Sequence, residues 1–305
     1  MTKVISIIGA TGKVGSKTVK NLLGKGYTLR LIARHEDKLK EFASEKGVEI
    51  YAGSATDAGF LTKVFSGSDV VFTMMPADFT STNIGASQDQ MGLAQLEAIK
   101  KSGVKRVLNL SSVGGHTEEK TGIVAGLARQ EKRLNELTGV DVLHLRPSYF
   151  LENNLGNIGM IKGMNFNGSA ISGDKAFPVI ATDDIAKVAA EKLEAANWTG
   201  KSVQPLLGAK DYTMKEVTTA LGKAIGKPEL PYVQFPYDQA KAAMVQMGLT
   251  ESIADSYIGL SEGVNEGVFN TEKRDANSTT PTTIEEFASK VFAPVYNAPE
   301  LVDSK

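Results

Sequence analysis

Residues 3–15 are KVISIIGATGKVG, a short apolar run followed at once by three glycines spaced three residues apart. The apolar run predicts a buried strand, and the amphipathic stretch at 13–25 predicts a helix. Between them, Gly9 permits a tight turn, Gly12 lets the backbone approach a pyrophosphate, and Gly15 lets the helix pack closely on the sheet. A helix N-terminus also offers free N–H groups and partial positive charge to phosphates. The stretch therefore predicts a dinucleotide-binding turn, with G-x-x-G-x-x-G in place of the common G-x-G-x-x-G.

The alternation of strand and helix patterns continues through the first 150 residues. Short apolar, β-branched runs lie at 3–8, 28–32, 48–51, 69–73, 105–110 and 141–145. Amphipathic stretches lie between them, at 13–25, 37–46, 57–65, 84–102 and 121–138. This pattern favours βαβ units and a parallel sheet covered on both faces. We expect an α/β fold with a doubly wound parallel Rossmann sheet of six or seven strands.

The pattern changes after residue 150. Residues 151–180 are rich in Asn and Gly and show little regular pattern, whereas a helix at 183–195 and a strand at 202–207 restore the alternation. Three further helices are predicted, at 238–247, 251–266 and 283–292. We expect residues 1–150, completed by 181–227, to form the Rossmann core. Residues 151–180 and 228–305 would form a smaller, mostly helical lobe on the substrate side.

The composition limits the classes of function. The 305-residue chain has 42% apolar and 23% charged residues, which is typical of a globular protein. Its net charge of −1 gives no sign of a basic surface that would bind nucleic acid or an anionic membrane. The absence of cysteine excludes disulfides and Cys-ligated metals and suits a reducing compartment. The three histidines are far apart and show no metal spacing. With neither a signal peptide nor a membrane span in the pattern, we expect a cytoplasmic protein without a bound metal.

The end of the second strand distinguishes NAD from NADP. NAD-binding proteins usually place an acid there for the ribose 2′-hydroxyl. This chain has LIARHEDKL, with Arg34 at that end and Lys38 four residues later. Two cations suit the 2′-phosphate of NADP. The alternative is a solvated surface arginine followed by the acids of a first helical turn. The sequence therefore favours NADP(H) over NAD(H).

Further cofactor contacts are expected where other strands end, because ligands bind outside the carboxyl ends of parallel strands. Ser54 follows the third strand, Met74 the fourth and Ser111 the fifth. These residues would meet the adenine, the ribose and the nicotinamide side, respectively. Met74 could equally be core filler.

Together these motifs resemble a known family. GATGKVG, the arginine after the second strand, NLSSVGG at 109–115 and LRPSYFLEN at 145–153 are similar to the NmrA-like branch of the atypical short-chain dehydrogenase/reductases, over about residues 1–230. That branch includes NAD(P)H-dependent quinone reductases and redox-sensing regulators without catalytic activity. The resemblance implies that Tyr149 and Asn153 line the nicotinamide and substrate side. It implies NADP(H) contacts at Gly9, Thr11, Gly12, Lys13, Val14, Arg34 and Lys38.

The chain departs from the catalytic short-chain dehydrogenases, which use a Tyr-x-x-x-Lys pair to protonate a carbonyl. The resemblance places Leu127 where that tyrosine would be and Glu131 where the lysine would be. Leu127 also belongs to one apolar helix face, which favours a core position. Tyr237 and Lys241 match the spelling of the pair, but they lie about a hundred residues too late, and we interpret them as a chance match.

Two functions stay open. A quinone needs no positioned acid, because hydride transfer gives an aromatic hydroquinone anion that water can protonate. The catalytic residues are unknown; the candidates are Ser112, His116 and Tyr149, with Phe150 on the substrate side, and His116 could equally be a solvated loop residue. We expect an NADPH-dependent oxidoreductase with a quinone or similar small electrophile as electron acceptor. The alternative is a non-catalytic NADP(H)-sensing regulator that binds a protein partner, and a homodimer is also left open.

Overall fold

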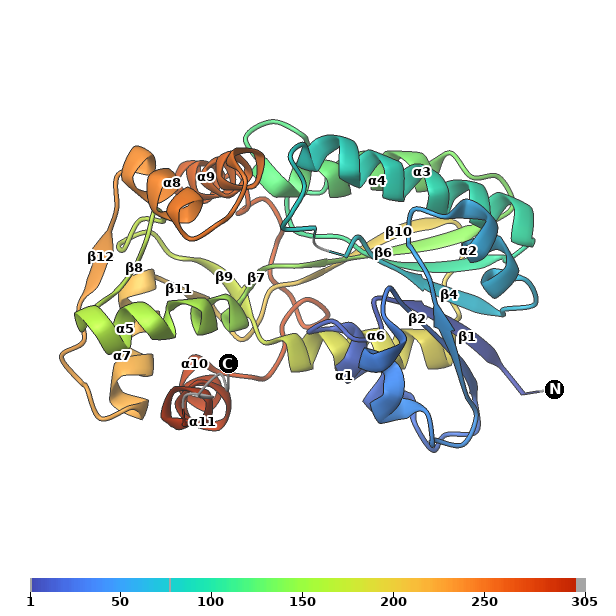
Figure 1. Cartoon of the computed structure of the whole chain (residues 1–305), viewed down its shortest axis with the longest axis horizontal. Coiled ribbons are helices and arrows are strands. Elements are labelled where there is room, and N and C mark those ends of the chain that lie inside the picture. Colours follow the sequence, from blue (N-terminus) through green and yellow to red (C-terminus); the bar gives the residue numbers. More distant parts are fainter. Residues whose placement is uncertain (1, 77, 300–305) are drawn as a thin grey trace.

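The computed structural model describes residues 2–76 and 78–299. Its centre is a seven-stranded sheet in the order β10-β6-β5-β4-β1-β2-β3 (Figure 1), and every neighbouring pair in it is parallel. The strands are β1 (Val4–Ile8), β2 (Thr28–Ala33), β3 (Val48–Ala52), β4 (Val70–Thr73), β5 (Arg106–Leu110), β6 (Asp141–Pro147) and β10 (Lys201–Leu206). The strand order reverses between β1 and β4, where a doubly wound sheet opens its ligand crevice. The predicted Rossmann sheet is confirmed.

Helices cover both faces of this sheet, as Figure 1 shows. On one face α1 (Gly15–Leu22) packs on α6 (Thr182–Ala195). On the other, α3 (Ile84–Ser102) lies between α2 (Ala58–Phe65) and α4 (Ala125–Asn135). Successive side chains of a strand point to opposite faces of the sheet, so alternate residues pack against the helices on one face and on the other. Hence strands that are apolar on both faces are stable only inside such a sandwich.

The predicted helix at 37–46 is wrong in type and length. A 3₁₀ helix, Glu36–Phe42, follows β2 instead. It buries only Leu39 and Phe42 against the core. With two anchoring side chains in seven residues, little apolar area is available to extend it into an α-helix.

The remaining residues form a second cluster at the carboxyl end of the sheet. Its strands are β7 (Tyr149–Phe150), β8 (Asn167–Ser169), β9 (Phe177–Ile180), β11 (Asp211–Tyr212) and β12 (Tyr232–Gln234). Its helical segments are a 3₁₀ helix (Leu151–Asn157), α5 (Ile158–Met164), α7 (Met214–Ala224), α8 (Tyr237–Gln246), α9 (Glu251–Glu266), α10 (Ile284–Phe287), a π-helical turn (Ala288–Phe292) and α11 (Ala293–Asn297). The helices predicted near 238–247, 251–266 and 283–292 are confirmed.

The prediction of little regular structure over 151–180 is wrong. That segment holds a 3₁₀ helix, α5, β8 and β9. The two short strands gain their partners from far along the chain, β8 from β12 and β9 from β7 and β11. Strands of three or four residues carry too little local pattern to be recognised, since pairing across the sheet stabilises them. Within the described residues, no helix is long and apolar enough to cross a membrane.

Candidate functional site

The glycine turn between β1 and α1 is built by close backbone contacts. Gly9 has φ 70°, and its N–H donates to the carbonyl of Ile32 at 3.0 Å. A Cβ on Gly9 would lie 2.4 Å from Sδ of Met74, and a Cβ on Gly15 would lie 2.0 Å from the carbonyl oxygen of Gly9. Only glycine leaves room for α1 to start this close to the strand. The glycines therefore let α1 begin directly against the end of β1.

The N-terminus of α1 is open to an anion. The helix begins at Gly15, two residues later than predicted, and it has neither a side-chain cap nor an acidic residue in its first turn. Uncapped N–H groups and the helix dipole favour a phosphate there. Gly12 and Lys13 are exposed and Thr11 is half-buried, whereas the side chain of Val14 is buried in the core. Val14 could thus meet a ligand only through its backbone.

Two cations lie beyond the end of β2. Arg34 and Lys38 are both exposed, and Lys38 is on the 3₁₀ helix that follows the strand. A carboxylate lies near them: hydrogen bonds from Thr80 and, more weakly, the charge of Arg34 hold the pKa of Asp78 below its usual value. The place predicted for a 2′-phosphate is therefore accessible from solvent, with Asp78 beside it.

The three other predicted rim residues differ in their surroundings. Ser54 is exposed, and its hydroxyl shares a 2.7 Å hydrogen bond with that of Thr56. Met74 is half-buried against the glycine turn. Ser111 is buried, and its hydroxyl donates to Oε1 of Glu131. Ser54 and Met74 thus lie where a cofactor could reach them, whereas the hydroxyl of Ser111 is already engaged.

Glu131 is a buried carboxylate held by an arginine. Arg146 donates from Nη2 to Oε2 at 2.7 Å and from Nε to Oε1 at 2.9 Å, and its Nη1 reaches Oε1 of Glu272 at 2.9 Å. The side chain of Glu131 is 4% exposed and that of Arg146 12%. Such a two-pronged pair is the strong form of ion pair in proteins. The pair and its contact with Glu272 join α4, β6 and the segment after α9.

A pocket of about 200 Å³ lies at the carboxyl ends of β5 and β6. It contains four of the predicted residues, which follow those two strands: Ser112, Tyr149, Phe150 and Asn153. Its other lining residues are Val113, Ile123, Val124, Ser148, Phe177, Pro178, Tyr257, Leu260, Val264 and Phe269. His116 is exposed on the loop after β5 and is not among them. The structure therefore brings three of the predicted substrate-side residues together with Ser112 and separates them from His116.

Burial controls the ionisation of the pocket's tyrosines. Burial raises the pKa of Tyr149 well above its usual value, although its hydrogen bond with Asn153 acts in the opposite direction. Burial also raises the pKa of Tyr257. The ring of Tyr149 meets Phe177 edge-on at 5.7 Å. Both phenols therefore stay protonated at neutral pH and can donate a hydrogen bond, but neither is poised to exchange a proton.

The far wall of the pocket comes from α9, about a hundred residues later in the chain. Glycines allow the close contact: a Cβ on Gly122 would lie 2.1 Å from the carbonyl oxygen of Ser256, and one on Gly263 would lie 2.0 Å from that of Lys120. The N-terminus of α9 is fastened to the loop after β4, where Oγ1 of Thr250 donates to the carbonyl of Ser81 at 2.5 Å. The helix thus closes the pocket, and no local sequence signal could have placed it there.

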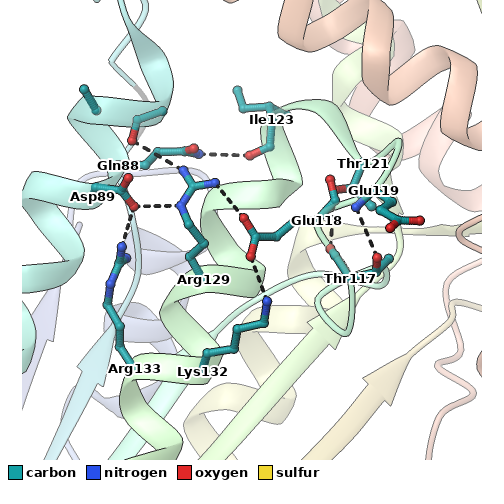
Figure 2. Close-up of polar contacts among 12 residues, drawn as sticks. Gln88, Asp89, Thr117, Glu118, Glu119, Thr121, Ile123, Arg129, Lys132 and Arg133 are labelled. Carbon is teal, nitrogen blue, oxygen red and sulfur yellow. Dashed lines mark hydrogen bonds and ion pairs between the residues drawn. The ribbon is translucent and has the colours of Figure 1, made fainter.

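A polar network holds the near wall in place (Figure 2). Nε of Arg129 donates to Asp89 of α3 at 2.7 Å, and its Nη1 donates to Glu118 at 3.2 Å. Lys132 donates to the same glutamate at 2.7 Å. The amide of Gln88 donates to the carbonyl of Ile123, which lines the pocket, at 2.9 Å. The loop after β5 is therefore tied to both α3 and α4.

Tyr237 and Lys241 have a structural place away from the pocket. Lys241 pairs with Asp255 at 2.6 Å and Glu251 at 3.4 Å. Nδ2 of Asn265 donates to the hydroxyl of Tyr237 at 2.9 Å. These contacts join α8 to α9, and neither Tyr237 nor Lys241 lines the pocket. Among the described residues, no group of three or more His, Asp or Glu is placed to hold a metal ion.

Comparison with known proteins places the chain in a family. Residues 1–288 match the NmrA-like family. The NAD(P)H azoreductase of Xenophilus azovorans is 28% identical over 83% of this chain and 84% of its own. Two solved structures share the fold: the NADPH-dependent quinone oxidoreductase of Escherichia coli complexed with NADPH (22% identity, 94% and 99% coverage, TM-score 0.73) and the triphenylmethane reductase of Citrobacter sp. complexed with NADP(H) (18%, 94% and 99%, 0.78). The chain belongs to the NmrA-like family.

Proposed function

We propose that this protein is an NADPH-dependent oxidoreductase that transfers a hydride to a quinone or a similar small electrophile. The observation that carries the proposal is the aromatic pocket at the carboxyl ends of β5 and β6, at the edge of the sheet where the glycine turn also opens. Ligands of doubly wound sheets bind along this edge. The names of the azoreductase and quinone oxidoreductase relatives support the same class of reaction.

The residues present fit a dinucleotide. The turn around Gly9 and the N-terminus of α1 would hold the pyrophosphate, since this helix end has no side-chain cap and no acidic residue in its first turn. Arg34 and Lys38 would hold a 2′-phosphate. The nicotinamide would then lie toward Ser112 and the pocket. The remaining contacts that we propose are Thr11, Gly12, Lys13, Val14, Gly15, Ser54, Met74 and Ser111.

The pocket's residues act by binding and orientation. When bound, the dihydronicotinamide supplies a hydride. Phe150 and the pocket's other rings hold the acceptor flat, so that orientation carries much of the rate. Tyr149 and Ser112 can donate hydrogen bonds to an acceptor oxygen as negative charge develops on it. The proton that completes a hydroquinone comes from water, because the described residues that line the pocket include no Asp, Glu or His.

A turnover assay tests the reductase directly. The purified protein is mixed with NADPH and a panel of quinones and isolated ketones, and the loss of NADPH absorbance is followed. We expect turnover of quinones and rates on isolated ketones lower by on the order of 10²- to 10⁴-fold, the usual contribution of a general acid. Tight NADPH binding with no turnover on any acceptor would sink the proposal.

One observation favours a second candidate, a non-catalytic NADP(H)-sensing regulator. Catalytic relatives of the wider superfamily carry their Tyr-x-x-x-Lys pair on the helix after β5. In this chain the corresponding positions are Leu127, which packs against the apolar core of the second cluster, and Glu131, which is paired with Arg146. This candidate predicts binding of a protein partner that changes between NADPH and NADP⁺. It would be supported by the result that sinks the reductase, namely tight cofactor binding without turnover.

Arg34→Ala is expected to weaken NADPH binding by roughly ten- to a hundred-fold, because a hydrogen bond to a charged group contributes about 1.5–3 kcal/mol. NADH affinity should change little, since NADH has no 2′-phosphate. Isothermal titration of both cofactors measures the two affinities. Lys40→Ala, at an exposed position of the neighbouring 3₁₀ helix, serves as the matched control. Unchanged NADPH affinity in Arg34→Ala would contradict the assignment.

A further inference from the structure

Glu152 is a buried carboxylate within the pocket segment, by which we mean residues 149–153. It belongs to the 3₁₀ helix Leu151–Asn157, which follows Tyr149 and Phe150 directly. Its side chain is 4% exposed, and it is not among the residues that line the pocket. A buried charge is costly unless it is paired and hydrogen-bonded, so the partners of Glu152 show what it holds together.

One partner of Glu152 is the first turn of α6. Both of its carboxylate oxygens accept from the backbone N–H of Thr182, at 2.9 and 3.1 Å, and Oε1 also accepts from the Thr182 hydroxyl. Thr182 is the first residue of α6, and the N-cap residue of this helix, Ala181, provides no side-chain cap. Glu152 therefore caps α6 from another part of the chain, at the helix end where the dipole favours a negative charge.

The other partner of Glu152 is Lys17 of α1. Nζ of Lys17 lies 3.4 Å from Oε1 of Glu152, and it donates to Oγ1 of Thr182 at 2.8 Å and to Asp183 at 2.7 Å. The Thr182 hydroxyl thus accepts from Lys17 and donates to Glu152. Lys17 is the third residue of α1, in the turn whose N–H groups would hold the pyrophosphate. These hydrogen bonds therefore join the cofactor-binding turn of α1 to the pocket segment.

Asn153 extends the connection into the pocket. It follows Glu152 in the chain, lines the pocket, and is hydrogen-bonded with the hydroxyl of Tyr149. A shift of Glu152 would therefore move residues that are expected to orient the acceptor. Orientation carries much of the rate of hydride transfer, and a displacement of about 1 Å can slow such a step by on the order of 100-fold.

We propose that Glu152 is a positioning residue, which holds the pocket segment against α1 and so aligns the acceptor with the nicotinamide. This inference rests on the proposed reductase and concerns the geometry of that same site. Glu152 acts through Lys17 and Thr182 on one side and through Asn153 on the other. Its partners are an N–H, a hydroxyl and an ammonium group, all of them donors, which suits a carboxylate because it only accepts.

Glu152→Ala tests this role in single turnovers of 1,4-benzoquinone at saturating NADPH. We expect hydride transfer to slow by roughly ten- to a hundred-fold, because the pocket segment is no longer held at its proper distance. The affinity for NADPH, measured by titration, should change little. Glu152→Gln keeps an oxygen that can accept from Thr182, and it should recover much of the rate. A wild-type rate in Glu152→Ala would overturn the proposal.

Asp184→Ala is the matched control, because Asp184 is a buried acid in the same first turn of α6. Its carboxylate accepts from the N–H of Thr282 at 3.1 Å and from the hydroxyl of Thr282 at 2.7 Å, so it ties α6 to the segment before α10. Urea unfolding should show a loss of stability in both alanine variants, but Asp184→Ala should keep its rate of hydride transfer. An equal loss of rate in the two would mean that Glu152 acts only by stabilising α6, and would overturn the proposal.

A second readout needs no turnover and separates this inference from the proposed function. The probe is 2′-phospho-ADP-ribose, which is NADP without the nicotinamide ring. In the wild-type protein we expect the probe to slow amide hydrogen exchange in residues 149–157, because Glu152 ties this segment to α1. Glu152→Ala should lose this slowing, and Asp184→Ala should keep it. Equal slowing in Glu152→Ala, or no slowing in the wild type, would overturn the inference.

Discussion

Arg146→Leu is expected to lower the free energy of unfolding by about 3–5 kcal/mol, the usual effect of removing one partner of a buried ion pair. The carboxylate of Glu131 would stay buried, with its charge uncompensated except for the hydroxyl of Ser111. The tie from β6 to Glu272 would be lost as well. Urea unfolding followed by circular dichroism measures the change, and the accompanying drop in Tm should be several degrees.

A second variant separates the buried charge from the lost packing. In Glu131→Leu/Arg146→Leu both charges are gone, so much of the lost stability should return. Arg129→Leu is the matched surface control. Its ion pairs with Asp89 and Glu118 are between side chains 24% to 38% exposed, and its loss should cost at most about 1 kcal/mol. A double variant that is no more stable than Arg146→Leu would contradict the explanation from buried charge.

Gly15→Ala is expected to reduce NADPH affinity by at least a hundred-fold. The added methyl group would lie 2.0 Å from the carbonyl oxygen of Gly9 and 3.2 Å from Cα of Ala10, so α1 must move away from the turn. Its N-terminal N–H groups would then no longer converge where the pyrophosphate binds. A displacement of about 1 Å at such a site is enough to lose much of the binding energy.

The affinity is measured by titration of the variant with NADPH, alongside circular dichroism to establish that it is folded. Gly159→Ala is the matched control, because that glycine is exposed on α5 and an added Cβ meets no atom within 4 Å. Its affinity should equal that of the unmodified protein. Wild-type affinity in folded Gly15→Ala would refute the idea that α1 must approach the strand this closely.

The parts that could be predicted are those whose cause is local. The inner strands β1 and β4 are short, largely apolar runs, and the turn at Gly9 follows from three glycines within seven residues. In both cases the residues that determine the structure are neighbours in the chain. The predicted α-helix at 37–46 was wrong because its cause is not local. Only Leu39 and Phe42 of that segment are buried in the core, and the local pattern does not show how little of the segment is buried.

The pocket could be recognised only from the tertiary structure. Tyr149 and Asn153 could be named from the LRPSYFLEN motif, but Tyr257, Leu260 and Val264 of the far wall were missed, because they come from α9 and no local signal places them there. Tyr237 and Lys241 are the opposite case. Their spacing matches the Tyr-x-x-x-Lys pair, but only the fold shows that their contacts join α8 to α9.

The sequence by itself determined the parallel sheet and the dinucleotide turn, because both depend on side chains and glycines within a few residues of one another. Only the tertiary structure decided how the pocket closes. It brought α9 against the loop after β5 through backbone contacts at Gly122 and Gly263, and it placed Glu131 against Arg146. These contacts join separate elements, and those of α9 span more than a hundred positions of the chain. They depend on how whole layers pack, and no local pattern encodes that packing.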